Sequence, residues 1–214
     1  MTSHFIDRFA RRAQDINTQQ QPSSSSSSGA PLGPTSAATS SREQVEQREL
    51  AGDRDDDCIF CAIVAHEEPA RTVYEDEHCV AFFDIYPIRP GHTLLIPKRH
   101  YERVPHLPDD LSAHLGRTMP RLCRALGRAM EQPDMNIVSN QGYAQVVPHI
   151  HFHLVPAPRR AGHSTRRGGL AFQNREELDD ETADLLAQKI RDELAKEAEA
   201  AATGESPRNG RGRL

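Results

Sequence analysis

The segment that most restricts the fold is VPHIHFHLVP, residues 147–156, in which histidines and apolar residues alternate. A period of two is typical of a β-strand, where alternate side chains point to the same face of a sheet. We therefore expect the histidines to share an open face and the apolar residues between them to pack into a core. Three imidazoles in register exceed what a structural role needs, so they indicate a functional site. They are His149, His151 and His153.

Two kinds of chemistry use such a row of imidazoles. Three histidines alone can hold a zinc ion that activates a water molecule. Alternatively, an imidazole attacks phosphorus directly, because its ordinary pKa of about 6.5 leaves a lone pair free near neutral pH. A neighbouring imidazolium then neutralises phosphate oxygens or protonates a leaving group. The three histidines by themselves leave both possibilities open.

The segments around the histidines predict an α+β fold with an antiparallel sheet of about five strands. Two β-branched and aromatic runs, at 72–76 and 79–85, predict a hairpin. Three further runs of the same kind predict the remaining strands, at 92–97, 135–139 and 150–155.

Two helices are expected. Leucine and methionine recur at helical spacing over residues 108–130, with Asp109 or Asp110 as the cap. Pro120 should kink or split this long helix. Nearer the C-terminus an amphipathic helix has one apolar face, formed by Leu186, Ile190 and Leu194. The pattern does not decide whether this helix docks on the sheet.

Composition divides the chain of 214 residues into four parts. Residues 1–54 are rich in Ser, Pro and Gln, so they bury too little apolar surface to fold and form a disordered arm. Residues 55–160 form the folded domain. A linker with the amphipathic helix follows at 161–200, and residues 201–214 form a disordered tail.

The charge and the hydropathy exclude two classes of partner. The net charge of −5 comes without a basic domain, which argues against nucleic-acid binding. No run approaches the roughly 18 apolar residues of a membrane span, so we expect no membrane association. The N-terminal residues MTSHFIDRFARRAQ contain three arginines but also two aspartates. We expect a cytoplasmic or nuclear protein, with a mitochondrial presequence as the alternative.

Three segments upstream of the triad connect it to a known family. They are CIFCAIV, VYEDEHCVAFFDIYPIRPGHTLLIPKRH and SNQGYAQVVPH. Together with PHIHFHLVP, they resemble the conserved blocks of the histidine triad (HIT) family, over roughly residues 57–158. The resemblance implies a HIT-like fold. It also implies a nucleotide hydrolase of the Hint-like branch, which cleaves nucleoside phosphoramidates at the α-phosphate.

The resemblance implies a role for individual residues. His151 would be the nucleophile and would form a covalent nucleotidyl-histidine, and a backbone carbonyl would fix its tautomer. His153 would contact phosphate oxygens and favour departure of the leaving group. Asp84 would accept hydrogen bonds from the ribose hydroxyls of a purine nucleotide.

Further substrate-binding residues follow from the same resemblance. Asn140 and Gln145 would lie near the phosphate. Here this chain departs from the family pattern, with Ala144 where glycine is usual and Val146 where a hydroxyl residue is often found. The base pocket would be apolar, formed by Ile59, Phe60, Ile63, Phe82, Phe83 and Ile85.

A structural zinc site is also implied, because several family members bind zinc at the corresponding positions. The four ligands would be Cys58, Cys61, His100 and His149. The Cys-x-x-Cys spacing alone leaves two buried cysteines as the alternative. His92 and His78 are interpreted as structural or surface residues.

Two other functional readings remain open. One is a dinucleoside polyphosphate hydrolase of the Fhit-like branch, and another is a non-catalytic nucleotide-binding scaffold. A transferase is disfavoured because that branch usually has Gln where this chain has His153. The family is usually homodimeric, which implies a dimer in which the helix at 108–130 forms the contact and the sheet continues across the interface.

Overall fold

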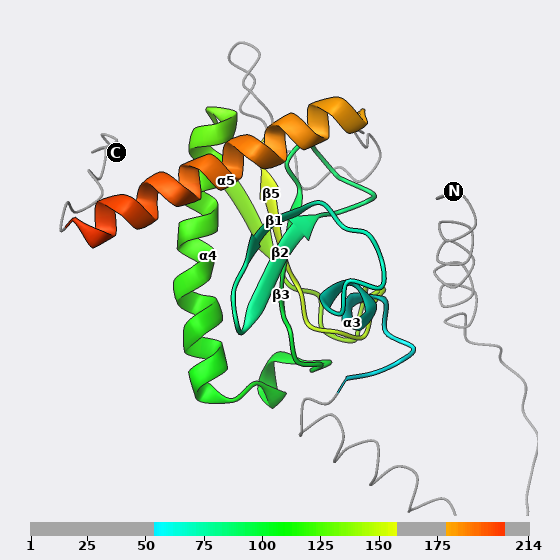
Figure 1. Cartoon of the computed structure of the whole chain (residues 1–214). Coiled ribbons are helices and arrows are strands. Elements are labelled where there is room, and N and C mark those ends of the chain that lie inside the picture. Colours follow the sequence, from blue (N-terminus) through cyan, green and yellow to red (C-terminus); the bar gives the residue numbers. More distant parts are fainter. Residues whose placement is uncertain (1–53, 158–178, 204–214) are drawn as a thin grey trace, which may run out of the picture. The chain divides into compact units, whose positions relative to one another are not determined.

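The computed structural model describes residues 54–157 and 179–203 (Figure 1). Predictions for the N-terminal arm, for most of the linker and for the tail after residue 203 lie outside these ranges. The elements, in chain order, are α3 (Ile59–Val64), β1 (Thr72–Glu75), β2 (Cys79–Phe83), β3 (Thr93–Pro97), the 3-10 turn η1 (Val104–His106), α4 (Asp109–Met130), β4 (Met135–Val138), β5 (Phe152–Pro156) and α5 (Asp180–Ala202). Within the described residues, no helix is both long and apolar enough to span a bilayer.

The five strands form one antiparallel sheet in the order β1-β2-β3-β5-β4. The predicted hairpin is present, with Glu75 of β1 paired with Val80 of β2. β5 lies between β3 and β4, so Leu94 and Val138 both pair with His153. The α+β class and the five-stranded sheet are therefore confirmed, and the end of the triad segment lies in β5, an interior strand next to the edge strand β4.

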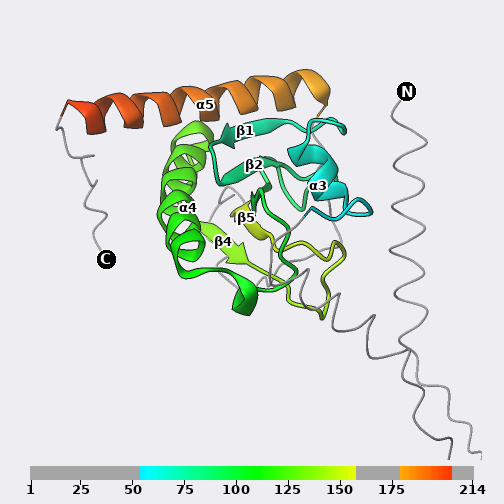
Figure 2. The ribbon, with the colours of Figure 1, turned by 60° about the horizontal axis from the view of Figure 1, so that its bottom comes forward.

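The two faces of the sheet have different neighbours. Alternate residues of β2 (Cys79, Ala81 and Phe83) belong to the main apolar core together with residues of α4 and α5. Phe82 lies on the other face, where its ring meets Phe60 of α3 at 5.6 Å. In Figure 2, α4 and α3 accordingly lie on opposite sides of the sheet. The short helix α3 was not predicted from the sequence.

The long helix α4 is continuous over 22 residues, so the predicted split at Pro120 does not occur. Pro120 lies on the exposed side of the helix, and Gly116, one turn earlier, is exposed as well. Water can therefore satisfy the carbonyl of Gly116 that a proline leaves without its helical partner. The predicted cap is also wrong. The N-cap residue is Pro108, which has no side-chain cap, and Asp109 and Asp110 lie in the first turn. Their negative charges stabilise the helix there by interacting with the positive end of its dipole.

The C-terminal helix α5 docks across α4 and β1. Its buried residues are Ala183, Ala187, Ile190 and Leu194. Small alanines let the helix approach the domain closely, so the buried face is rotated slightly from the predicted one and Leu186 lies at its margin. Asp179 caps the helix by accepting from the backbone N–H of Thr182 at 2.9 Å.

Polar contacts surround this apolar interface. Arg128 of α4 pairs with Glu193 at 2.7 Å, and Arg71 pairs with Asp184 at 2.8 Å. Arg191 donates to the carbonyl oxygen of Thr72, at the outer edge of β1, at 2.9 Å. The helix therefore both covers the core and occupies the free edge of the first strand.

Candidate active site

The histidine triad straddles the start of β5. Only His153 lies within the strand, which begins at Phe152, so the prediction that all three histidines share a strand is wrong. The preceding segment is held by a different contact, from the N–H of Ile150 to the carbonyl of Tyr101 at 2.6 Å. The face is not open either, because His149 is fully buried and His151 is 4 % exposed. Burial of the imidazoles follows from the packing of α3 against this face.

Ring contacts divide the triad into two groups. His149 meets His100, with ring centroids 4.9 Å apart, and His151 meets His153 at 4.8 Å. The edge of Phe60 contacts both His149 and His151, at 5.8 and 5.4 Å. Phe60 thus lies between a Cys/His cluster and a pair of histidines with different surroundings.

The tautomer of His151 follows from one hydrogen bond. Its Nδ1 lies 2.7 Å from the carbonyl oxygen of His149. A carbonyl only accepts, so Nδ1 carries the hydrogen and Nε2 carries the lone pair. Burial lowers the pKa of His151 below its ordinary value, which favours the neutral ring. The predicted backbone carbonyl is therefore present, and His151 has the form of a nucleophile.

A fourth histidine, His92, contacts the triad, although the sequence placed it among structural or surface residues. Its Nδ1 accepts from the N–H of Ile88 at 3.2 Å, so the hydrogen of its ring lies on Nε2. Nε2 is 2.9 Å from Nδ1 of His153 and donates to it. His153 must then carry its own hydrogen on Nε2. Burial, with a contribution from His151, lowers the pKa of His153 to about 4.

Asp84 follows β2 and lies beside these histidines. One carboxylate oxygen accepts from the N–H of Tyr86 at 2.8 Å, and the other is 3.5 Å from Nδ1 of His92. The ligand atoms of Asp84, His92 and His153 all lie within 4.8 Å of one another. The structure therefore brings the predicted ribose-binding residue to the triad, as the sequence blocks implied.

The residues predicted for the base pocket separate into distinct environments. Phe60 and Phe82 contact each other on the triad side of the sheet. Phe83 instead belongs to the core beneath α4, because consecutive residues of a strand face opposite ways, so its assignment to the pocket is wrong. Ile85 is exposed by 57 %. Ile59 and Ile63 are half-buried on α3.

In the loop before the triad, the side chain of Gln145, which was predicted to lie near the phosphate, makes hydrogen bonds to the protein backbone. Gln145 accepts from the N–H of Gly142 at 2.7 Å and donates to the carbonyl of Glu102 at 2.9 Å. Ala144 has φ of +55°, a left-handed conformation that explains why glycine suits this position in the family. Asn140 is half-buried in the same loop. Phosphate contacts of Asn140 and Gln145 stay predictions.

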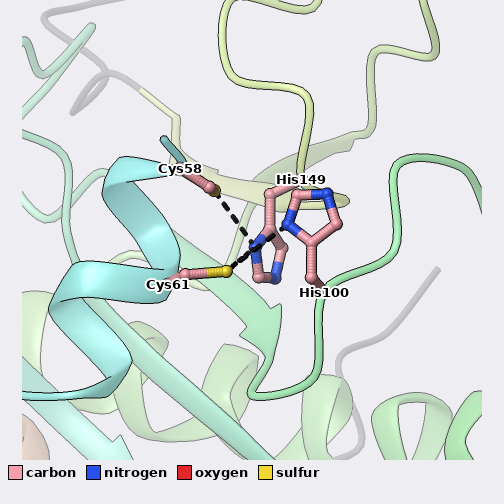
Figure 3. A group of neighbouring side chains, drawn as sticks. All are labelled: Cys58, Cys61, His100 and His149. Atoms are coloured by element: carbon pink, nitrogen blue, oxygen red, sulfur yellow. Dashed lines mark hydrogen bonds between the residues drawn. The ribbon is translucent and has the colours of Figure 1, made fainter. Parts of the chain in front are cut away.

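The four predicted zinc ligands come together at the start of α3 (Figure 3). Nδ1 of His149 lies 3.5 Å from Sγ of Cys58 and 3.7 Å from Sγ of Cys61. Nδ1 of His100 lies 3.4 Å from Sγ of Cys61. A tetrahedral zinc ion with Zn–S of about 2.3 Å and Zn–N of about 2.0 Å separates sulfur from nitrogen by about 3.6 Å. The three sulfur–nitrogen separations therefore match those of a tetrahedral zinc site.

The surroundings of the cluster suit a metal as well. Nε2 of His149 is 2.9 Å from the carbonyl of Pro97, so its other nitrogen is left for coordination. The Cys58 thiol, assisted by His100 and His149, holds the pKa of Cys61 well below its ordinary value despite burial. A thiolate beside two imidazoles is the donor set that zinc prefers.

Comparison with known proteins agrees with this geometry. The HIT domain model matches residues 65–160. An uncharacterized HIT-like protein of Methanocaldococcus jannaschii is 45 % identical over 46 % of this chain and 78 % of its own length. The adenylylsulfatase HINT3 of Arabidopsis thaliana is 34 % identical over 61 % of this chain and 66 % of its length. The adenosine 5'-monophosphoramidase HNT1 of Saccharomyces cerevisiae is 39 % identical over 46 % and 61 %.

A solved structure extends the likeness to the fold. The crystal structure of a zinc-bound histidine triad family protein from Mycobacterium smegmatis superposes with a TM-score of 0.56 at 34 % identity, covering 67 % of this chain and 97 % of that one. Sequence blocks, sheet order and the paired histidines thus converge on one assignment. The chain belongs to the histidine triad (HIT) family.

Proposed function

We propose that this protein is a hydrolase that releases a nucleoside monophosphate from phosphoramidates or related nucleotides. The observation that carries the proposal is the tautomer pair: the lone pair of His151 lies on Nε2, and His153 presents an N–H on its own Nε2. A neutral nucleophile beside a hydrogen-bond donor suits displacement at phosphorus. The names of HNT1 and HINT3 support an adenylyl group as the part of the substrate that is transferred to His151.

The reaction proceeds in two displacements. Nε2 of His151 attacks the α-phosphorus and forms an N–P bond, while the bond to the leaving group breaks and that group departs with the electron pair and takes up a proton from solvent. Water then attacks phosphorus, breaks the N–P bond, gives up a proton to solvent and releases the nucleoside monophosphate, which restores neutral His151. The N–H of His153 donates to a phosphate oxygen in both steps, where charge develops.

Asp84 and two aromatic rings position the purine nucleotide in this proposal. The carboxylate of Asp84 accepts hydrogen bonds from the ribose hydroxyls. The rings of Phe60 and Phe82 lie on the same side of the sheet as His151 and contribute apolar surface for the base. In this proposal the sugar binds at the end of β2 and the phosphate binds at the triad.

Zinc is the proposed structural cofactor, bound by Cys58, Cys61, His100 and His149. It would hold the start of α3 against the loop that enters β5. The support is the fit of the four donor atoms and the zinc-bound relative from Mycobacterium smegmatis. When bound, zinc supplies cross-linking between segments distant in sequence, and all four coordination positions are taken by protein.

A homodimer is the proposed assembly. β4 is an edge strand, and its Ile137 pairs with Leu154 of β5, which places it on the face that α4 covers. Ile137 is nevertheless 47 % exposed. A second copy that pairs along β4 and packs against α4 would cover it. Sedimentation of the purified protein, compared with Ile137→Lys, tests this assembly.

Covalent trapping tests the proposed chemistry. Protein mixed with adenosine phosphoramidate labelled at phosphorus should retain label after an acid-free quench, whereas His151→Ala should retain none. His66→Ala is the matched control, because His66 is exposed and lies outside the site. Equal hydrolysis by His151→Ala would refute the nucleophile. Preference for diadenosine triphosphate over the phosphoramidate would favour the Fhit-like reading, and binding without turnover would favour the scaffold.

A further inference from the structure

A second group of metal-ligating side chains lies away from the triad, where the β1–β2 turn meets α4. Asp76 follows β1, Cys79 begins β2, and His114 lies on α4. Their ligand atoms are all within 4.8 Å of one another. Cys79 belongs to the core beneath the helices, whereas the triad faces α3. This cluster is therefore separate from the site that binds the proposed substrate.

Hydrogen bonds hold the carboxylate of Asp76 at the centre of the cluster. One oxygen accepts from the N–H groups of His78 and Cys79, at 2.8 and 2.9 Å. The other accepts from the hydroxyl of Tyr74 at 2.7 Å and lies 2.8 Å from Nε2 of His114. The position of Asp76 is therefore set by the backbone of the turn and does not depend on His114.

Access from solvent exists on one side of the cluster. The side chains of Asp76 and His114 are 23 % and 25 % exposed, whereas Cys79 is fully buried. The ring of His78, which is exposed, packs edge-on against His114 with centroids 4.8 Å apart. Two of the three side chains are thus within reach of solvent, and the thiol lies beneath them.

We propose that Asp76, Cys79 and His114 form a second metal site that takes zinc or a similar borderline-soft divalent ion. One sulfur, one imidazole nitrogen and one carboxylate oxygen are a mixed set that suits zinc, while the sulfur disfavours magnesium and calcium. Three protein ligands leave one tetrahedral position for water. The ion exchanges more readily than one held by four buried ligands.

Binding requires a defined exchange of protons. The thiol of Cys79 loses its proton to solvent when the Cys79–metal bond forms. Nε2 of His114 turns its lone pair to the ion, so any hydrogen that it shares with Asp76 leaves that nitrogen. Binding therefore releases protons and strengthens as pH rises. The ion would link the first half of α4 to the β1–β2 turn.

Metal counting on the full-length chain tests this site. Protein stripped with a chelator is titrated with Co²⁺, and bound metal is counted after gel filtration together with the thiolate-to-cobalt absorption band. Wild type should bind about one more ion per chain than Cys79→Ser or His114→Gln. Cys123→Ser is the matched control, because Cys123 is half-buried on α4 and outside both clusters. It should bind as much metal as wild type.

The result also separates this site from the proposed structural zinc. Cys61→Ser removes a ligand of the first cluster only. The difference in metal content between wild type and Cys79→Ser therefore reports on the second site, whether or not the first cluster binds zinc. If circular dichroism shows that Cys79→Ser does not fold, the metal content of His114→Gln decides the test. His114 is partly exposed, so its substitution should leave the fold intact. Equal metal content in wild type and both variants would overturn the second site.

Discussion

His92 provides the sharpest test of how the active site is organised. Its two ring nitrogens make hydrogen bonds with opposite roles: Nδ1 accepts from the N–H of Ile88, and Nε2 donates to His153. Two substitutions separate them. In His92→Gln the amide nitrogen stands near the position of Nε2 and keeps the donor. In His92→Asn the amide oxygen stands near Nδ1 and keeps the acceptor, but the donor to His153 is lost.

The expected loss of rate follows from how far the His92–His153 hydrogen bond is shielded from water. His92 is 2 % exposed, so water does not replace a lost partner. Leaving the partly buried Nδ1 of His153 without its donor costs about 1–3 kcal/mol. If that contact orients His153 in the transition state, the rate falls by about 10- to 100-fold, at about 1.4 kcal/mol for each factor of ten. His92→Asn should show this loss, and His92→Gln should stay within about threefold of wild type.

The assay is single-turnover formation of labelled protein from adenosine phosphoramidate, which reports the step that uses His151 and His153. Thermal unfolding of both variants serves as the control, since each loses one hydrogen bond of His92 and both should be destabilised to a similar degree. A wild-type rate in His92→Asn would refute the reasoning. So would a His92→Gln rate as slow as that of His92→Asn at equal stability.

Four further predictions follow from the described residues. Ile190→Ala should lower the free energy of unfolding by about 2–5 kcal/mol, because Ile190 is fully buried on the inner face of α5, whereas Leu185→Ala, 62 % exposed on the same helix, should change it by less than about 0.5 kcal/mol in chemical denaturation. Because the pKa of His153 is lowered to about 4 and that of His151 is also lowered, both rings stay neutral in mildly acidic solution, and the acid limb of kcat/KM should lie below pH 6.5; a midpoint at or above 6.5 would contradict the site description. Cys61→Ser should lose the proposed structural zinc by elemental analysis and unfold at a lower temperature, and an unchanged metal content would remove that site. Asp84→Asn should raise KM for a nucleotide far more than for its 2',3'-dideoxy analogue, and equal effects on both would exclude contact with the ribose.

The parts of the site that were predictable share a local signal. The alternation in residues 147–156 indicated β5. The metal cluster was indicated by the Cys-x-x-Cys spacing only together with the family resemblance, which supplied His100 and His149. His92 was not assignable in this way, because it reaches His153 across 61 positions and only through the pairing of β3 with β5. A buried histidine before a strand has no periodic signature.

The errors have equally specific causes. All five residues of β2 are buried, so nothing in that run told which of Phe82 and Phe83 faces the triad. The buried face of α5 includes Ala183 and Ala187, and alanines carry little weight in a hydrophobic pattern even where they set how closely two helices approach. The contact of α3 with the imidazoles turned an expected open face into a buried one.

Docking of α5 gives the sheet two unlike borders. Arg191 already donates a hydrogen bond to a carbonyl of β1, and α5 packs beside that strand. A strand from another molecule therefore cannot pair with that carbonyl unless the Arg191 side chain moves away. Among the described residues, no helix packs against β4 as extensively as α5 packs against β1. In the part of the chain that the structure describes, β4 is thus the border that leaves more backbone available for strand addition. If two copies join along β4, the joined sheet has a guarded strand at each end, and the assembly closes at two without propagating into a fibre.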